Sequence, residues 1–89
     1  MSTPQPKVEV YVTDYCPYCW RAKALLQKRD VAYEEIDVSG DHARRAWLVQ
    51  ATGMRTVPQI FIGGKPVGGS DELHALDRSG ELAKMLGRA

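Results

Sequence analysis

The chain has 89 residues, 44% of them hydrophobic and 26% charged, and a formal net charge of +1. This length and composition are typical of one globular domain, and the nearly neutral charge gives no reason to expect a nucleic acid or a charged membrane surface as a partner. Because there are only two cysteines, a secreted scaffold held by several disulfides is excluded.

Residues 1–6 are polar and contain two prolines, which predicts a short mobile tail ahead of a single domain over residues 7–89. The start of the chain does not resemble a signal peptide, and no apolar run approaches the length of a membrane span. We therefore expect a cytoplasmic protein.

The expected elements alternate between strand and helix. Alternating β-branched residues over 7–12 predict a strand that leads into the cysteines, and the residues after Pro17 follow a helical period up to Asp30. Next come a strand over 31–38, a helix over 43–52, strands at 57–62 and 63–67, and a helix that starts near Ser70 or Asp71 and breaks at Ser79-Gly80. The order β-α-β-α-β-β-α predicts an α/β fold with parallel and antiparallel strand pairs.

Local signals mark the ends and faces of these helices. Asp41 is expected to cap the second helix and Gly53 to end it, with an apolar stripe of Trp47, Leu48 and Ala51 between them. In the first helix, Ala22, Leu25 and Leu26 share the buried face.

Cys16-Pro17-Tyr18-Cys19 is the motif with the clearest chemistry. Residues three apart at the start of a helix are neighbours, so the two sulfurs can form a disulfide after a small rearrangement. Cys16 lies at the helix N-terminus, which favours a thiolate, and is expected to be the nucleophile. Cys19 is expected to be the more buried, resolving thiol, and Asp14 to face water or cap the helix.

A zinc site is the structural alternative for the two cysteines. His42 and His74, the only histidines, would have to complete it, but they are far apart in the sequence and lack the close spacing of a zinc finger. Both are expected to be solvated surface residues, and no metal is expected.

Four motifs follow one another along the chain: Cys16-Pro17-Tyr18-Cys19, Arg21-Ala22-Lys23-Ala24-Leu25-Leu26, Thr56-Val57-Pro58-Gln59-Ile60-Phe61-Ile62 and Gly68-Gly69-Ser70-Asp71-Glu72-Leu73. In this order and spacing they resemble the dithiol glutaredoxins in their small bacterial form, over residues 8–86. The resemblance implies a thioredoxin-like fold, with a four-stranded mixed sheet flanked by helices, and glutathione-dependent thiol-disulfide exchange.

The resemblance also implies a glutathione site. A cis Val57-Pro58 bond would turn the Val57 backbone toward the cysteinyl part of glutathione, and a helix N-terminus at Ser70 would receive the γ-glutamyl carboxylate. The glycyl carboxylate would lie near Arg45. The implied glutathione-binding residues are Thr13, Tyr18, Arg45, Thr56, Val57, Pro58, Gly69, Ser70 and Asp71.

The chain departs from the family pattern at two of these positions. Thr13 stands where many members have a lysine that contacts the glycyl carboxylate, and Arg45, where some relatives have glutamine, is expected to compensate. Ser70 stands where relatives often have a third cysteine.

Three aromatic residues surround the motif. Tyr18 is expected to be exposed beside the glutathione sulfur, with Tyr15 at the same rim. Trp20 is expected to pack against its neighbours rather than to border the protein substrate.

The resemblance implies glutathione and glutathionylated or disulfide-bearing proteins as partners of a monomeric enzyme. Two other functions share the fold. One is an iron–sulfur carrier that uses Cys16 plus glutathione, against which Pro17 argues, because cluster-binding relatives usually have a smaller residue there. The other is an electron donor to a reductase that is itself reduced by a flavoprotein, against which the glutathione-binding residues argue.

Overall fold

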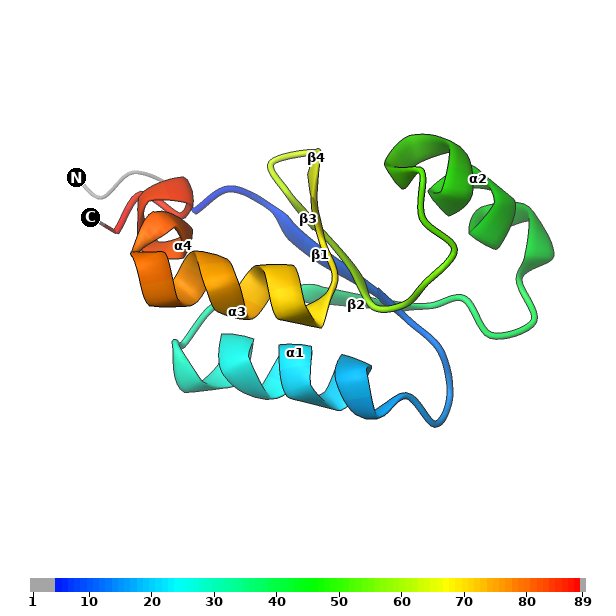
Figure 1. The fold of residues 1–89 in the computed structure, drawn as a ribbon, viewed down its shortest axis with the longest axis horizontal. Coiled ribbons are helices and arrows are strands. Elements are labelled where there is room, and N and C mark those ends of the chain that lie inside the picture. The colour runs from blue at the N-terminus through cyan, green and yellow to red at the C-terminus, as the bar shows by residue number, and fades with distance from the viewer. Residues whose placement is uncertain (1–4, 89) are drawn as a thin grey trace.

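The computed structural model describes residues 5–88 and confirms the predicted order of elements (Figure 1). A four-stranded sheet has the strand order β2-β1-β3-β4. The elements are β1 (Val8–Val12), α1 (Pro17–Lys28), β2 (Glu34–Asp37), α2 (His42–Thr52), β3 (Gln59–Ile62), β4 (Lys65–Gly68), α3 (Ser70–Ser79) and α4 (Glu81–Met85).

The sheet is mixed, as predicted. β1 runs parallel to β2, with Val10 opposite Glu35, and antiparallel to β3, with Val10 opposite Ile60. β3 and β4 form the expected antiparallel pair. The parallel pair needs a crossover, which α1 supplies, so the loop from β1 into α1 emerges at the end of a central strand.

The helices cover both faces of the sheet, with α1 and α3 side by side on one face and α2 on the other (Figure 1). Because side chains alternate along a strand, Val10 and Tyr11 of β1 point to opposite faces. The larger core lies under α1, α3 and α4, and it includes Val8, Val10, Val12, Ala22, Leu25, Leu26, Ile60, Ile62, Leu73, Leu82 and Leu86.

The smaller core under α2 corrects the predicted apolar stripe of that helix. Leu48 is buried with Tyr11 and Phe61, but Ala51 is exposed. Trp47 is 46% exposed and stacks on Phe61 with a 5.7 Å separation of ring centroids. The helix therefore contacts the sheet through a narrower set of side chains than its sequence predicts.

The ends of α2 follow the predicted signals. The Asp41 carboxylate accepts a hydrogen bond from the Arg44 N–H at 3.1 Å, and Gly53 ends the helix in the left-handed conformation at a φ of 74°. The same kind of ending at Gly80, with a φ of 83°, separates α3 from α4, which confirms the predicted break.

Helix α3 starts at Ser70, as predicted, and its N-cap residue is Gly69. The Glu72 carboxylate accepts a hydrogen bond from the Gly69 N–H at 2.7 Å and thereby supplies the side-chain half of the cap.

The predicted tail can be followed only from Gln5, because residues 1–4 lie outside the described residues. The Gln5 side-chain amide donates to the Ala32 carbonyl at 2.9 Å. Within residues 5–88, no helix is both long and apolar enough to cross a membrane.

Candidate functional site

The two cysteines lie at the start of α1, as predicted. Cys16 is the N-cap residue, and its Sγ accepts a hydrogen bond from the Cys19 N–H at 3.3 Å. Both are free thiols, 8% exposed at Cys16 and 1% at Cys19. The more accessible sulfur thus faces the free N–H groups of the helix, where the helix dipole stabilises negative charge.

A second loop brings backbone polar groups to Cys16. The Val57–Pro58 peptide bond is cis, as the resemblance implied. The Cys16 thiol donates to the Val57 carbonyl at 3.7 Å, so this loop lies directly beside the sulfur. The segment ahead of Cys16 is held as well, because the Asp14 N–H donates to the Ser39 hydroxyl at 2.8 Å while the Asp14 side chain is exposed.

Gln59 positions the Val57 loop, a role that the sequence did not reveal. Its side chain is fully buried, and its amide Nε2 donates to the Thr56 carbonyl at 2.8 Å and to the Thr56 hydroxyl at 3.3 Å. These bonds pair the Nε2 of the buried amide, whereas its buried Oε1 has no hydrogen-bond partner among the described residues. The only available signal was a polar residue inside the apolar run of β3.

Cys19 is held as a neutral thiol. Burial raises its pKa to about 12, with a further contribution from its hydrogen bond with Cys16. A thiol with this pKa reacts slowly until a disulfide forms beside it, which suits the predicted resolving role.

Alkylation with iodoacetamide at pH 7.5 is expected to modify Cys16 at least about 100-fold faster than Cys19, because the thiolate is the reactive species. With a pKa of about 12, fewer than about one Cys19 in 10⁴ is a thiolate at this pH. Peptide mapping by mass spectrometry measures both rates, and unfolding in urea should make them similar. Similar rates in the folded protein would contradict the assignment.

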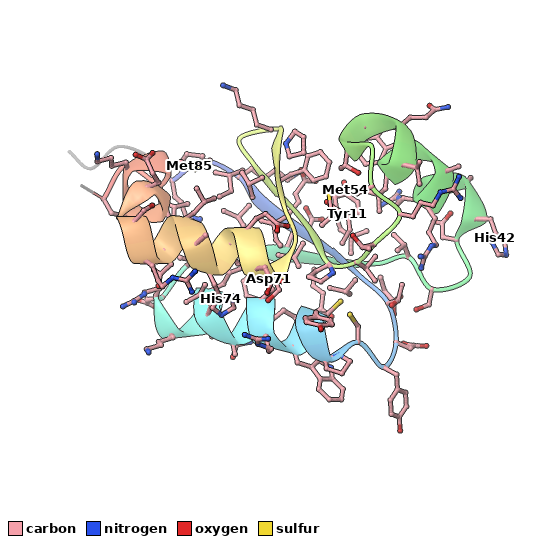
Figure 2. The ribbon with its side chains drawn as sticks, viewed as in Figure 1. Tyr11, His42, Met54, Asp71, His74 and Met85 are labelled. Atoms are coloured by element: carbon pink, nitrogen blue, oxygen red, sulfur yellow. The ribbon has the colours of Figure 1, made fainter. Side chains whose placement is uncertain are left out.

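A groove of about 230 Å³ runs beside the cysteines. It brings together residues of α1, the cis-proline loop and the start of α3, most of which the resemblance implied. Figure 2 shows Asp71 and His74 on the part of α3 that runs beside α1. The groove is lined by Tyr18, Met54, Thr56, Val57, Pro58, Gly69, Ser70, Asp71 and Glu72.

Ser70 and His74 are linked at this end of α3. Ser70 is 3% exposed, and the Ser70 carbonyl lies 2.8 Å from Nδ1 of His74, which places the ring proton on Nδ1. His74 is therefore partly buried rather than a solvated surface residue, whereas His42 is exposed, as predicted. No group of three potential metal ligands occurs among residues 5–88.

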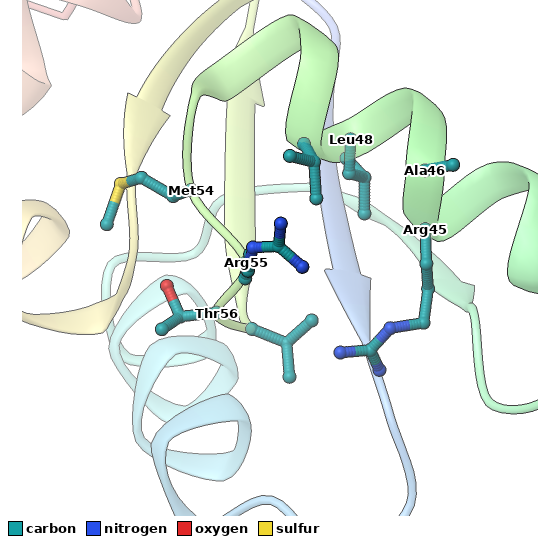
Figure 3. A pocket seen from close by; sticks show the side chains of 8 residues that line it. Arg45, Ala46, Leu48, Met54, Arg55 and Thr56 are labelled. Carbon is teal, nitrogen blue, oxygen red and sulfur yellow. The ribbon is translucent and has the colours of Figure 1, made fainter.

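A second pocket of about 220 Å³ adjoins the groove and shares Met54, Thr56 and Val57 with it. Arg45 of α2 and Arg55 of the loop before β3 both extend toward this pocket (Figure 3). Arg55 was not among the predicted residues, although a cation directly before Thr56-Val57-Pro58 could have indicated it. Thr13 is half-buried and lines neither pocket.

Comparisons with known proteins agree with this geometry. A family model described as Glutaredoxin matches residues 8–67. The chain is 51% identical to "Glutaredoxin" of Pseudomonas aeruginosa over 81 residues, covering 91% of this chain and 96% of the relative. It is 46% identical to "Glutaredoxin 3" of Escherichia coli over 79 residues, covering 89% and 95%.

Two solved structures are also similar. A buckwheat glutaredoxin–glutathione complex matches with a TM-score of 0.87 and 40% identity, over 92% of this chain and 77% of that one. The solution structure of a Brucella melitensis glutaredoxin matches with a TM-score of 0.86 and 42% identity, over 97% and 94%. The chain therefore belongs to the glutaredoxin family of glutathione-dependent thiol-disulfide oxidoreductases.

Proposed function

We propose that this protein reduces protein–glutathione mixed disulfides through Cys16, with glutathione as the electron donor. The observation that carries the proposal is the position of the Cys16 sulfur. It lies at a helix N-terminus, 3.7 Å from the Val57 carbonyl, beside a groove of about 230 Å³. The buckwheat relative crystallised with glutathione supports the same ligand here.

The monothiol route needs Cys16 alone. Its thiolate attacks the glutathionyl sulfur of the mixed disulfide, a Cys16–glutathione bond forms, and the protein sulfur leaves as a thiolate that takes up a proton. The thiolate of a second glutathione then attacks the glutathionyl sulfur on Cys16. Oxidised glutathione is released, and the Cys16 thiolate is regenerated.

The dithiol route adds Cys19 for targets that contain a disulfide. Cys16 attacks one target sulfur and forms a mixed disulfide, and Cys19 loses its proton and displaces the target, leaving a Cys16–Cys19 bond. Two glutathione molecules reduce this bond. Glutaredoxin couples lie at about −200 to −230 mV, close to the cytosolic glutathione poise of about −220 to −260 mV. We propose a cytoplasmic location on this basis, and a monomer because every group that the two routes use lies in one chain.

We propose an extended pose for glutathione across both pockets. The γ-glutamyl carboxylate meets the free N–H groups at the start of α3, and Asp71 accepts from the ammonium. The cysteinyl part pairs with the Val57 backbone. The glycyl carboxylate meets the Arg45 and Arg55 guanidinium groups, which replace the cation missing at Thr13.

The assay for this function follows turnover of a glutathionylated peptide with glutathione, glutathione reductase and NADPH. Steady NADPH consumption is expected with the wild-type protein. If the peptide were not turned over, while a flavoprotein reductase reduced the Cys16–Cys19 disulfide directly, the protein would be a dedicated electron donor.

Arg45→Gln is expected to raise the apparent KM for glutathione about five-fold, because one charge-assisted hydrogen bond at a partly exposed site is worth about 1 kcal/mol. Initial rates against glutathione concentration measure the change. Arg44→Gln is the matched control, since Arg44 lies on the same helix but contacts Asp41 and lines neither site pocket. An unchanged KM in Arg45→Gln would exclude Arg45 from the glycyl site.

A further inference from the structure

Three large exposed apolar side chains of the described residues, Tyr15, Tyr18 and Trp20, lie within four residues of Cys16 in the sequence. Five large ones are exposed, namely Tyr15 (93%), Trp20 (56%), Tyr18 (55%), Trp47 (46%) and Met54 (40%). Tyr18 and Met54 line the groove, while Tyr15 and Trp20 line neither pocket of the site. The prediction that Trp20 packs against its neighbours is therefore wrong, and its exposure next to the reacting sulfur needs another explanation.

Trp20 lies one helical turn after Cys16. Its N–H donates to the Cys16 carbonyl at 3.1 Å. Side chains of a helix lean toward its N-terminus, so the Trp20 ring covers the surface over the turn that begins at Cys16. Tyr18, two residues earlier, projects from a different side of the helix and reaches the groove. The Trp20 surface is thus adjacent to the sulfur and outside the groove.

Tyr15 is held in an unusual conformation on the other side of Cys16. Its φ is 51°, in the left-handed region that residues other than glycine rarely occupy. The ring is almost fully exposed, so the conformation is not maintained by burial of this side chain. Residues in such conformations cluster at active sites and ligand clamps, where the surrounding structure holds them in place.

We propose that Tyr15 and Trp20 form a docking surface for the polypeptide of the glutathionylated protein, and that they contact aliphatic or aromatic side chains next to the modified cysteine. This inference rests on the proposed function. The Tyr15–Trp20 surface would bind the protein part of the substrate, whereas the groove would bind its glutathione part.

The chemistry of exchange places the polypeptide on this surface. A thiolate attacks a disulfide in line with the bond that breaks, so the glutathionyl sulfur lies between Cys16 and the departing protein sulfur. With glutathione in the groove of Tyr18 and Val57, the protein must cover the surface outside the groove and next to Cys16. Tyr15 and Trp20 are the large apolar side chains there.

The charges near the surface favour an apolar contact. Asp14 and Arg21 flank it with opposite signs, and both are exposed, so neither an acidic nor a basic peptide would be strongly preferred. Tyrosine and tryptophan rings offer a large contact area with few rotatable bonds, which explains their enrichment at interfaces.

The test measures kcat/KM of the wild-type protein, Trp20→Ala and Tyr15→Ala with three substrates. They are the cysteine–glutathione mixed disulfide, a glutathionylated peptide with leucine and phenylalanine beside the cysteine, and a matched peptide with glycine and serine there. We expect Trp20→Ala and Tyr15→Ala to lower kcat/KM about five-fold for the apolar peptide and less than two-fold for cysteine–glutathione. Trp20→Phe should keep most of the wild-type kcat/KM for the apolar peptide. The wild-type protein should have a higher kcat/KM for the apolar peptide than for the peptide with glycine and serine.

Any of the following results would overturn the docking surface. Equal losses for all three substrates would mean that the rings act on the cysteine rather than on the polypeptide. Unchanged kinetics in both variants would exclude a contact. Unchanged kinetics combined with a loss of concentration-dependent self-association, measured by sedimentation, would identify a second copy of this chain as the occupant. If the wild-type protein turned over none of the substrates, the proposed function would fail, and the docking surface with it.

Discussion

Cys16→Ser is expected to lower the turnover of a glutathionylated peptide by at least about 10³-fold, whereas Cys19→Ser should retain at least about half of the wild-type rate. A serine hydroxyl without an adjacent base is a poor nucleophile, and no disulfide can form on it. Cys19 is 1% exposed, and burial raises its pKa to about 12, so it cannot replace Cys16 in the first attack.

The two variants separate the two routes when a peptide with an internal disulfide is the second substrate. Cys19→Ser should lose reduction of this substrate by the dithiol route, because nothing displaces the target from Cys16. Coupled NADPH consumption measures both reactions, and circular dichroism checks that each variant is folded. Loss of both activities in Cys19→Ser would contradict the assignment of Cys16 as a nucleophile that is sufficient for the monothiol route.

The fold was predictable because several independent sequence signals indicate the same elements. The alternation in β1, the buried stripe of α1 and the end signals at Asp41, Gly53 and Gly80 all agree with the same β-α-β-α-β-β-α order. The prediction was weakest where these signals were weak. Glu34 and Glu35 interrupt the alternation, and β2 is shorter than the predicted residues 31–38, at Glu34–Asp37.

The site was predictable where it consists of a local motif. The helical period of the residues after the motif, together with Pro17, placed Cys16 at the helix start and Cys19 one turn further. Contacts made by tertiary folding were not visible in the sequence. Gln59 bonds to Thr56 only because β3 is buried, and Arg55 joins Arg45 only because α2 lies above the cis-proline loop. The exposure of Trp20 depends on which side of α1 the sheet covers.

Gly68→Ala is expected to lower the free energy of unfolding by about 3 kcal/mol, through backbone strain, a steric clash and a lost cap. Gly68 has a φ of 110°, and a Cβ there would lie 2.7 Å from Cγ and 2.8 Å from Cβ of Glu72. Since the Cβ of Glu72 is fixed to the backbone of α3, a movement of the Glu72 carboxylate alone cannot relieve the clash. Moving Glu72 would also break its 2.7 Å hydrogen bond with the Gly69 N–H.

The same change should weaken glutathione binding, because Gly69 and Ser70 begin the helix proposed to hold the γ-glutamyl carboxylate. Urea unfolding and the apparent KM for glutathione measure the two effects.

Gly64→Ala is the matched control, since the φ of Gly64 is 83° and nothing lies within 4 Å of the added Cβ. Gly64→Ala is expected to lower the free energy of unfolding by about 1 kcal/mol, through backbone strain alone. If both variants were equally destabilised, the close approach of Gly68 to Glu72 would have no role in holding the start of α3. Combining Gly68→Ala with Glu72→Ala should relieve only the contact with Cγ, because alanine keeps the Cβ atom that would lie 2.8 Å away.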